Sequence, residues 1–119
     1  MKERPKTIFC DIDGTLVKHY DPHTMSRPLH KMEILPGTID KLLEWDRKGY
    51  NIILVSGRKE SLREATEKQL AQAGIFYDRL MMGIGGGARY LINDRKPDGE
   101  EAAFSVSIDR NEGIKNIKL

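Results

Sequence analysis

The chain is organised around Ile8-Phe9-Cys10-Asp11-Ile12-Asp13-Gly14-Thr15-Leu16-Val17. This apolar run is typical of a strand, and it ends in two carboxylates, a glycine and a hydroxyl. Side chains alternate along a strand, so Asp11 and Asp13 are expected on the same side. Two carboxylates at such a short separation repel each other unless a cation lies between them or one keeps its proton. Because oxygen ligands favour a hard ion, the pair predicts Mg²⁺; an ordinary acidic turn is the alternative.

Strand and helix patterns alternate along the rest of the chain. Apolar runs predict five strands, and amphipathic stretches bounded by glycines predict two helices between them, with a short third helix over 97–103. The strands are expected at about 7–10, 50–55, 79–82, 90–92 and 104–108, and the two main helices at about 38–48 and 59–73. The fold class is therefore α/β, with a Rossmann-like, doubly wound parallel sheet of about five strands.

Polar residues follow three of the predicted strands. These residues are Asp11, Asp13 and Thr15 after the first strand, Ser56, Gly57 and Arg58 after the second, and Asn93 and Asp94 after the fourth. In an open parallel sheet, ligands bind beyond the carboxyl ends of the strands, so these groups are expected to meet. Ser56 also reads as a helix cap, a role compatible with phosphate binding at a helix N-terminus. Arg58 is expected to form a fork on the same phosphate, with a surface position as the alternative.

The motif Asp11-Ile12-Asp13-Gly14-Thr15 resembles the first motif of the haloacid dehalogenase (HAD) superfamily, whose members are mostly Mg²⁺-dependent phosphohydrolases. The resemblance implies that Asp11 is the nucleophile and forms an aspartyl-phosphate. It also implies that Asp13 is the general acid and base, and that Asp11 and the backbone carbonyl of Asp13 hold Mg²⁺. Gly14 and Thr15 are expected beside the phosphate.

Two further stretches resemble motifs of the same superfamily. Ser56 matches the second motif, where a hydroxyl and a backbone N–H bind the phosphoryl oxygens, and Gly57 is expected to share in this contact. Asn93-Asp94 resembles the fourth, metal-binding motif, which implies Asp94 as a Mg²⁺ ligand and Asn93 as a neutral ligand or supporting acceptor. The superfamily's usual strand order, 3-2-1-4-5, would place the Asp11 strand centrally.

The superfamily's third motif supplies a lysine just after the third strand, where this chain reads Gly83-Ile84-Gly85. Arg89 and Lys96 are the nearest basic residues that could replace it. Flexible glycines at 85–87 could bring Arg89 inward to the phosphate. Lys96 directly follows the metal motif and carries an ammonium, so we expect Lys96 to act in catalysis.

Composition narrows the function class. The 119 residues suit a single domain over 1–119, and a net charge of +2 does not by itself indicate a nucleic-acid partner. Cys10, the only cysteine, cannot form an internal disulfide, which favours a reducing cytoplasm. No apolar run approaches the length of a membrane span. Residues 18–35 are expected to form a short flap, too short for a cap domain.

These observations predict a capless, Mg²⁺-dependent phosphomonoester hydrolase. The modest charge favours a small phosphorylated metabolite, such as a sugar phosphate, as the substrate. Two alternatives stay open: a polynucleotide-end phosphatase, and a non-catalytic module that binds phosphate or metal. An open site suits either a polymer end or a lid from another subunit, so an oligomer is possible.

Overall fold

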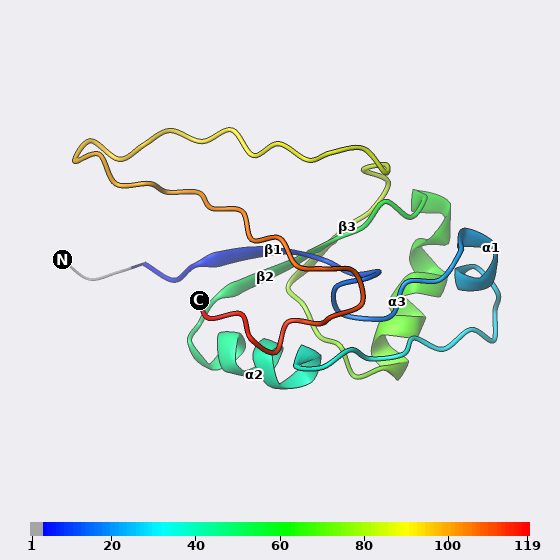
Figure 1. Cartoon of the computed structure of the whole chain (residues 1–119). Helices are drawn as coiled ribbons and strands as arrows, with labels where there is room; N and C mark the ends of the chain where they lie inside the picture. The colour runs from blue at the N-terminus through cyan, green and yellow to red at the C-terminus, as the bar shows by residue number, and fades with distance from the viewer. Residues whose placement is uncertain (1–3) are drawn as a thin grey trace.

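A computed structural model describes residues 4–119 of the chain, so the first three residues of the predicted domain lie outside the described residues (Figure 1). Three strands form one parallel sheet in the order β1-β2-β3. Their bounds are Thr7–Asp11 for β1, Asn51–Val55 for β2 and Arg79–Met81 for β3. Asp11 pairs with Val55, which pairs with Met81 on its other side. The carboxyl ends of the strands therefore meet at one edge of the sheet.

The helices are α1 (Pro22–Met25), α2 (Thr38–Arg47) and α3 (Arg63–Gln72), with a 3₁₀ turn, η1 (Glu60–Leu62), directly before α3. α2 connects β1 to β2, and η1 with α3 connects β2 to β3. Because each connection leads to the next strand in the same direction, right-handed crossovers place both helices on the same face. Burial agrees, since Cys10 and Leu54 are buried whereas Phe9, on the opposite face, is 52% exposed.

The core lies between that covered face and the two longer helices. It is built from Ile8, Cys10, Ile52, Leu54 and Leu80 of the strands, Leu42 and Trp45 of α2, and Leu70 of α3. The pattern follows the sequence: alternate residues of each strand point inward, and the apolar stripe of α2 faces the sheet. None of the helices among the described residues is long and apolar enough to cross a membrane.

The predicted five-stranded sheet is wrong in its second half. The order of β1, β2 and β3 agrees with the 3-2-1 part of the expected order, but residues 90–92 and 104–108 form no strand and 97–103 form no helix. The described elements also place helices on one face of the sheet, where the doubly wound arrangement has them on both. Tyr90–Ile92 is only three residues long, with glycines before it and a polar stretch ending in Pro97 after it. A pairing this short is weakly specified, and Pro97 cannot donate to a ladder.

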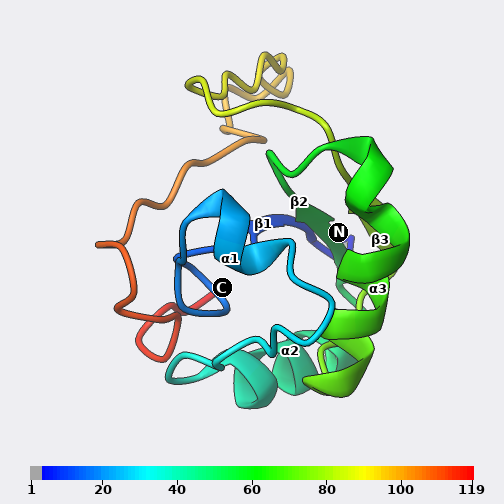
Figure 2. The same cartoon turned by 90° about the vertical axis from the view of Figure 1, so that its right-hand side faces the viewer.

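Residues 84–108 form an extended excursion, here called the arm. In Figure 1 the arm (yellow to orange) runs back past the amino ends of the strands, and in Figure 2 it again lies apart from them. After the arm, residues 109–119 return to the body of the domain and form a segment here called the strap. Ile114 of the strap is 1% exposed, and its N–H donates to the carbonyl of Pro36 at 3.1 Å.

The two ends of the flap predicted at 18–35 lie side by side and are joined by two backbone hydrogen bonds. The N–H of Lys18 donates to the carbonyl of Glu33 at 2.8 Å, and the N–H of Leu35 donates to that of Leu16 at 3.0 Å. α1 is the one helix that the structure describes within the flap.

Candidate active site

The two carboxylates predicted to carry the chemistry lie at the carboxyl end of β1. Asp11 is the last residue of the strand, and the chain then folds into a tight loop in which the N–H of Gly14 donates to the carbonyl of Val17 at 2.7 Å. Gly14 adopts a φ of +89°, a left-handed conformation that side chains rarely tolerate. The hydroxyl of Thr15 donates to Oδ2 of Asp11 at 3.4 Å, so the loop folds back onto the carboxylate.

The environment of Asp11 disfavours its charged form. Burial raises the pKa of the Asp11 carboxyl above its ordinary value, and the nearby charge of Asp13 raises the pKa further. The positive charge of Arg89 acts in the opposite direction, as do hydrogen bonds from the Ile12 N–H and the Thr15 hydroxyl. Burial also raises the pKa of the adjacent Cys10 thiol to about 12, with the Asp11 charge as the second cause. Asp11 is therefore a partly desolvated carboxylate with a cation close by.

The guanidinium of Arg58 binds the carboxylate of Asp13. Its Nε donates to Oδ2 of Asp13 and its Nη2 to Oδ1, both at 2.9 Å. Nη1 donates to the hydroxyl of Thr66 at 3.2 Å and to Oε1 of Gln69 at 2.8 Å. Arg58 is buried, so the surface alternative is wrong, and the fork expected on phosphate lies on a carboxylate. The guanidinium orients Asp13.

Thr66 and Gln69 are functional partners that the sequence reasoning missed. They lie three residues apart on α3, and both are buried although polar. Residues at i and i+3 share a helix face. Two polar residues on the inward-facing side of α3 could therefore have indicated a buried charge opposite them.

Ser56 and Gly57 lie beside the carboxylates at the end of β2. Ser56 is buried, and its hydroxyl accepts from the N–H of Arg58 at 3.0 Å, so it caps the turn after the strand. It is not the N-cap of the following helical turn, which is Lys59. A Cβ on Gly57 would come within 2.7 Å of the carbonyl oxygen of Gly85. Only glycine therefore lets the glycine-rich stretch after β3 approach the site this closely.

The two basic candidates lie in different surroundings. Arg89, near the start of the arm, is close enough to Asp11 to shift the pKa of that carboxyl, and its Nη2 donates to the carbonyl of Gly85 at 3.4 Å. Lys96 is exposed near the turn of the arm, and its Nζ lies 3.7 Å from Oε2 of Glu100. The structure therefore brings Arg89, and not Lys96, into the field of Asp11.

The predicted Mg²⁺ ligands are only partly assembled. Asp11 and Asp13 offer oxygens at one place, which suits a hard ion. Asn93 and Asp94 are exposed on the arm, where Nδ2 of Asn93 donates to the carbonyl of Asp94 at 3.1 Å. Among residues 4–119, no three or more His, Cys, Asp or Glu side chains form a group that could hold a metal. The donors present therefore do not complete the expected site.

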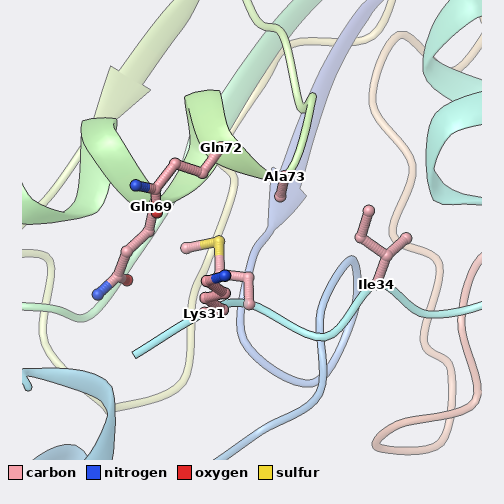
Figure 3. A pocket seen from close by; sticks show the side chains of 6 residues that line it. Lys31, Ile34, Gln69, Gln72 and Ala73 are labelled. Atoms are coloured by element: carbon pink, nitrogen blue, oxygen red, sulfur yellow. The ribbon is translucent and has the colours of Figure 1, made fainter. Parts of the chain in front are cut away.

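A hollow of about 470 Å³ lies between the flap and α3 (Figure 3), and neither Asp11 nor Asp13 lines it. Lys31, Met32 and Ile34 of the flap and Gln69, Gln72 and Ala73 of the α3 region line it. Gln69 links this hollow to the site, because it accepts from Arg58 and donates through Nε2 to the carbonyl of Met25 at 3.1 Å. The flap is thereby tied to the residue that holds Arg58.

Comparisons with known proteins identify the family of the chain. Residues 5–96 match the family model of the polynucleotide kinase PNKP phosphatase domain. A comparison with curated protein sequences finds no match.

Several solved structures resemble the chain. A chain of the Pnkp1/Rnl/Hen1 complex is 35% identical over 72% of this chain, with a TM-score of 0.58, and a chain of the Pnkp1/Rnl/Hen1 RNA repair complex is 37% identical over 66%, with a TM-score of 0.56. The present chain spans only 30% and 25% of those two chains. A Vibrio cholerae protein, 17% identical, shares the fold over 96% of this chain and 90% of its own, with a TM-score of 0.58. By the family match over residues 5–96, the chain belongs to the polynucleotide kinase phosphatase domains of the HAD superfamily, a family of phosphoric monoester hydrolases.

Proposed function

We propose that this domain removes the terminal phosphate of a polynucleotide. The match of residues 5–96 to the polynucleotide kinase phosphatase domain carries this proposal. The flap supports it, because among the described residues the flap contains one four-residue helix, α1, and is too short to form a cap domain that would exclude a polymer end.

Asp11 is proposed as the nucleophile. One of its carboxylate oxygens attacks phosphorus, the bond from phosphorus to the leaving oxygen breaks, and an aspartyl-phosphate forms. Water then attacks the phosphorus, which returns the Asp11 carboxylate and releases inorganic phosphate. Partial burial supports this role, because a carboxylate with fewer water contacts is the more reactive one.

Asp13 is proposed to move the protons. It would donate one to the leaving oxygen in the first step and take one from the attacking water in the second. Arg58 contacts each Asp13 oxygen once, at 2.9 Å, and each oxygen has a second lone pair that can still carry or accept a proton. The fork therefore holds the carboxyl in position without occupying every site on it.

Arg89 is proposed to offset the charge of the phosphoryl group beside Asp11. Its influence on the pKa of Asp11 supports this role, which the superfamily's lysine fills elsewhere. Mg²⁺ held by Asp11 and the Asp13 carbonyl would add positive charge and orient the phosphoryl group, whereas the other expected ligands, Asn93 and Asp94, lie exposed on the arm.

A panel of substrates tests the proposal. Release of inorganic phosphate is measured, with and without Mg²⁺, from 5′- and 3′-phosphorylated oligonucleotides, from sugar phosphates and from an aryl phosphate. We expect kcat/KM to be highest for one of the oligonucleotides, and no release by Asp11→Asn. A higher value for a sugar phosphate would favour the small-metabolite alternative, and no turnover of any compound would favour a non-catalytic module.

A further inference from the structure

Arg110 of the strap lies against the loop that follows β1 and carries Asp13. A Cβ placed on Gly14 would be 3.3 Å from Cγ of Arg110 and 3.9 Å from its Nε. Gly14 directly follows Asp13, so this guanidinium stem crosses the loop next to the proposed acid and base. A side chain at position 14 would crowd the Arg110 stem, so the glycine permits this close approach.

The backbone around Arg110 is held in place by contacts to the same loop. Asn111 has a φ of 66°, and it is the one residue other than glycine with a positive φ among the described residues. Its N–H donates to the carbonyl of Gly14 at 2.8 Å, and its Oδ1 accepts from the N–H of His19 at 2.8 Å. Buried Ile114 anchors the strap a few residues later. Asparagine adopts this left-handed conformation readily, so these contacts hold the backbone beside Arg110 against the loop after β1.

Among the described residues no carboxylate pairs with Arg110, and the same holds for Arg27, Arg47 and Arg79; what distinguishes Arg110 from these three is its place against the loop after β1. Arg58 pairs with Asp13, Arg63 with Glu60 and Glu67, and Arg95 with Glu101. The Arg110 side chain is exposed. A positioned, solvent-accessible guanidinium beside a catalytic loop is suited to bind an anion of the substrate.

Arg110 and Arg89 lie in different surroundings. Arg89 is the cation in the field of Asp11, where the transferred phosphoryl group would lie, whereas the stem of Arg110 lies against Gly14 and the next residue, Asn111, contacts Gly14 and His19. A phosphorylated polynucleotide end always carries a second phosphate, the phosphodiester one nucleotide away; an aryl phosphate carries none.

We infer that Arg110 forms a second anion subsite, which binds the phosphodiester adjacent to the terminal phosphate. This inference rests on the proposed polynucleotide-end activity and names the residue that selects for a polymer. Arg110 is thus a specificity-determining residue that acts in substrate binding and takes no part in bond breaking.

Binding is measured first, in the Asp11→Asn background so that no substrate is consumed. A fluorescent single-stranded oligonucleotide with a terminal phosphate is titrated with the full chain over a range of salt concentrations. Arg110→Ala should weaken binding about tenfold and reduce the slope of log affinity against log salt by about 0.7, as expected for one lost phosphate contact on a single strand. Arg110→Lys should keep the slope and lose part of the affinity.

Arg47→Ala is the matched control. It removes the same charge from an exposed position in the last turn of α2, which precedes the amino end of β2 and so lies at the opposite end of the sheet from the site. Circular dichroism of each variant checks that the fold is retained. If Arg110→Ala and Arg47→Ala change the affinity and the slope equally, the subsite is overturned.

Kinetics are then measured in the chain with native Asp11. They separate the Arg110 subsite from the proposed polynucleotide-end activity. Arg110→Ala should raise KM about tenfold for the oligonucleotide with little change in kcat, so that the ratio of kcat/KM for the oligonucleotide to kcat/KM for the aryl phosphate falls about tenfold. Equal losses on both substrates would overturn the subsite while leaving the polynucleotide-end activity standing. A chain with native Arg110 that hydrolyses sugar phosphates better than oligonucleotides would instead overturn the proposed function, and the subsite with it.

Discussion

The guanidinium of Arg58 and the carboxylate of Asp13 form a two-pronged ion pair, with both N···O distances at 2.9 Å. The two side chains are only 5% and 14% exposed. The pair joins the turn after β2 to the loop after β1, and Thr66 and Gln69 complete the guanidinium's hydrogen bonds from α3. Three segments of the site therefore depend on one buried cation.

Removing that cation should destabilise the domain strongly. Arg58→Met leaves the Asp13 carboxylate buried without its partner, which costs about 3–5 kcal/mol. Urea unfolding at pH 7 measures the change in the free energy of unfolding. Arg95→Met, which breaks an exposed pair with Glu101, is the control and should cost less than about 1 kcal/mol. The double variant Asp13→Asn/Arg58→Met should recover part of the loss, and equal costs for Arg58→Met and Arg95→Met would contradict a stabilising role.

Asp11→Asn should abolish turnover while keeping the fold. The amide has the shape of the carboxylate but lacks the nucleophilic charge, and losing a nucleophile commonly costs several orders of magnitude in kcat. Phosphate release and circular dichroism are measured on the same sample. A variant that kept a tenth of the activity would exclude Asp11 as the nucleophile.

Asp11→Asn should also change how stability depends on pH. The folded-state pKa of Asp11 is raised above 3.8, chiefly by burial, so the native state holds this proton over a pH range in which the unfolded chain has lost it. The favourable contribution of protonated Asp11 is present below pH 3.8 and is lost as the pH rises through the folded pKa. Relative to the native sequence, Asp11→Asn should therefore gain stability between pH 3.8 and neutrality.

Unfolding by urea at a series of pH values, with a chelator to remove metal ions, measures this difference. We expect the gain in the free energy of unfolding of Asp11→Asn over the native sequence to be near zero at acid pH and to reach a plateau at neutral pH. A difference that shrinks as the pH rises would show that the site favours the charged carboxylate.

Arg89→Ala should slow the reaction, and Lys96→Ala should not. Arg89 acts on Asp11 electrostatically, whereas Lys96 pairs with Glu100 on the arm. Losing one charged contact in the transition state costs about a hundredfold in kcat. Steady-state kinetics on the best oligonucleotide substrate compare the two variants, each the control for the other. A large loss in Lys96→Ala alone would restore the lysine to the catalytic role predicted for it.

Cys10 should be nearly inert in the folded chain. Burial and the Asp11 charge raise the pKa of its thiol to about 12, so only about 10⁻⁴ of it is thiolate at pH 8. Mass spectrometry after iodoacetamide treatment should show slow alkylation in buffer and rapid alkylation in urea. Equal rates would mean that β1 opens readily.

Much of the domain is predictable from local sequence. The run from Ile8 to Asp13 predicts both the strand and its two carboxylates, because alternation along a strand is a property of the backbone. β2, α2 and the η1–α3 segment follow in the same way from apolar periodicity and from glycines at their ends. The superfamily is identifiable from Asp11-Ile12-Asp13-Gly14-Thr15, which the family match confirms.

Tertiary structure decides which charges meet. Arg58 and Asp13 are 45 positions apart, and His19 and Asn111 are 92 apart, so no local pattern shows that either pair is in contact. The arm was mispredicted for the same reason: a strand exists only when a neighbour pairs with it, and Tyr90–Ile92 has the composition of a strand without a partner in the sheet. Composition and periodicity describe what a segment can form, whereas the partner that satisfies a buried charge or an open strand edge depends on the whole fold.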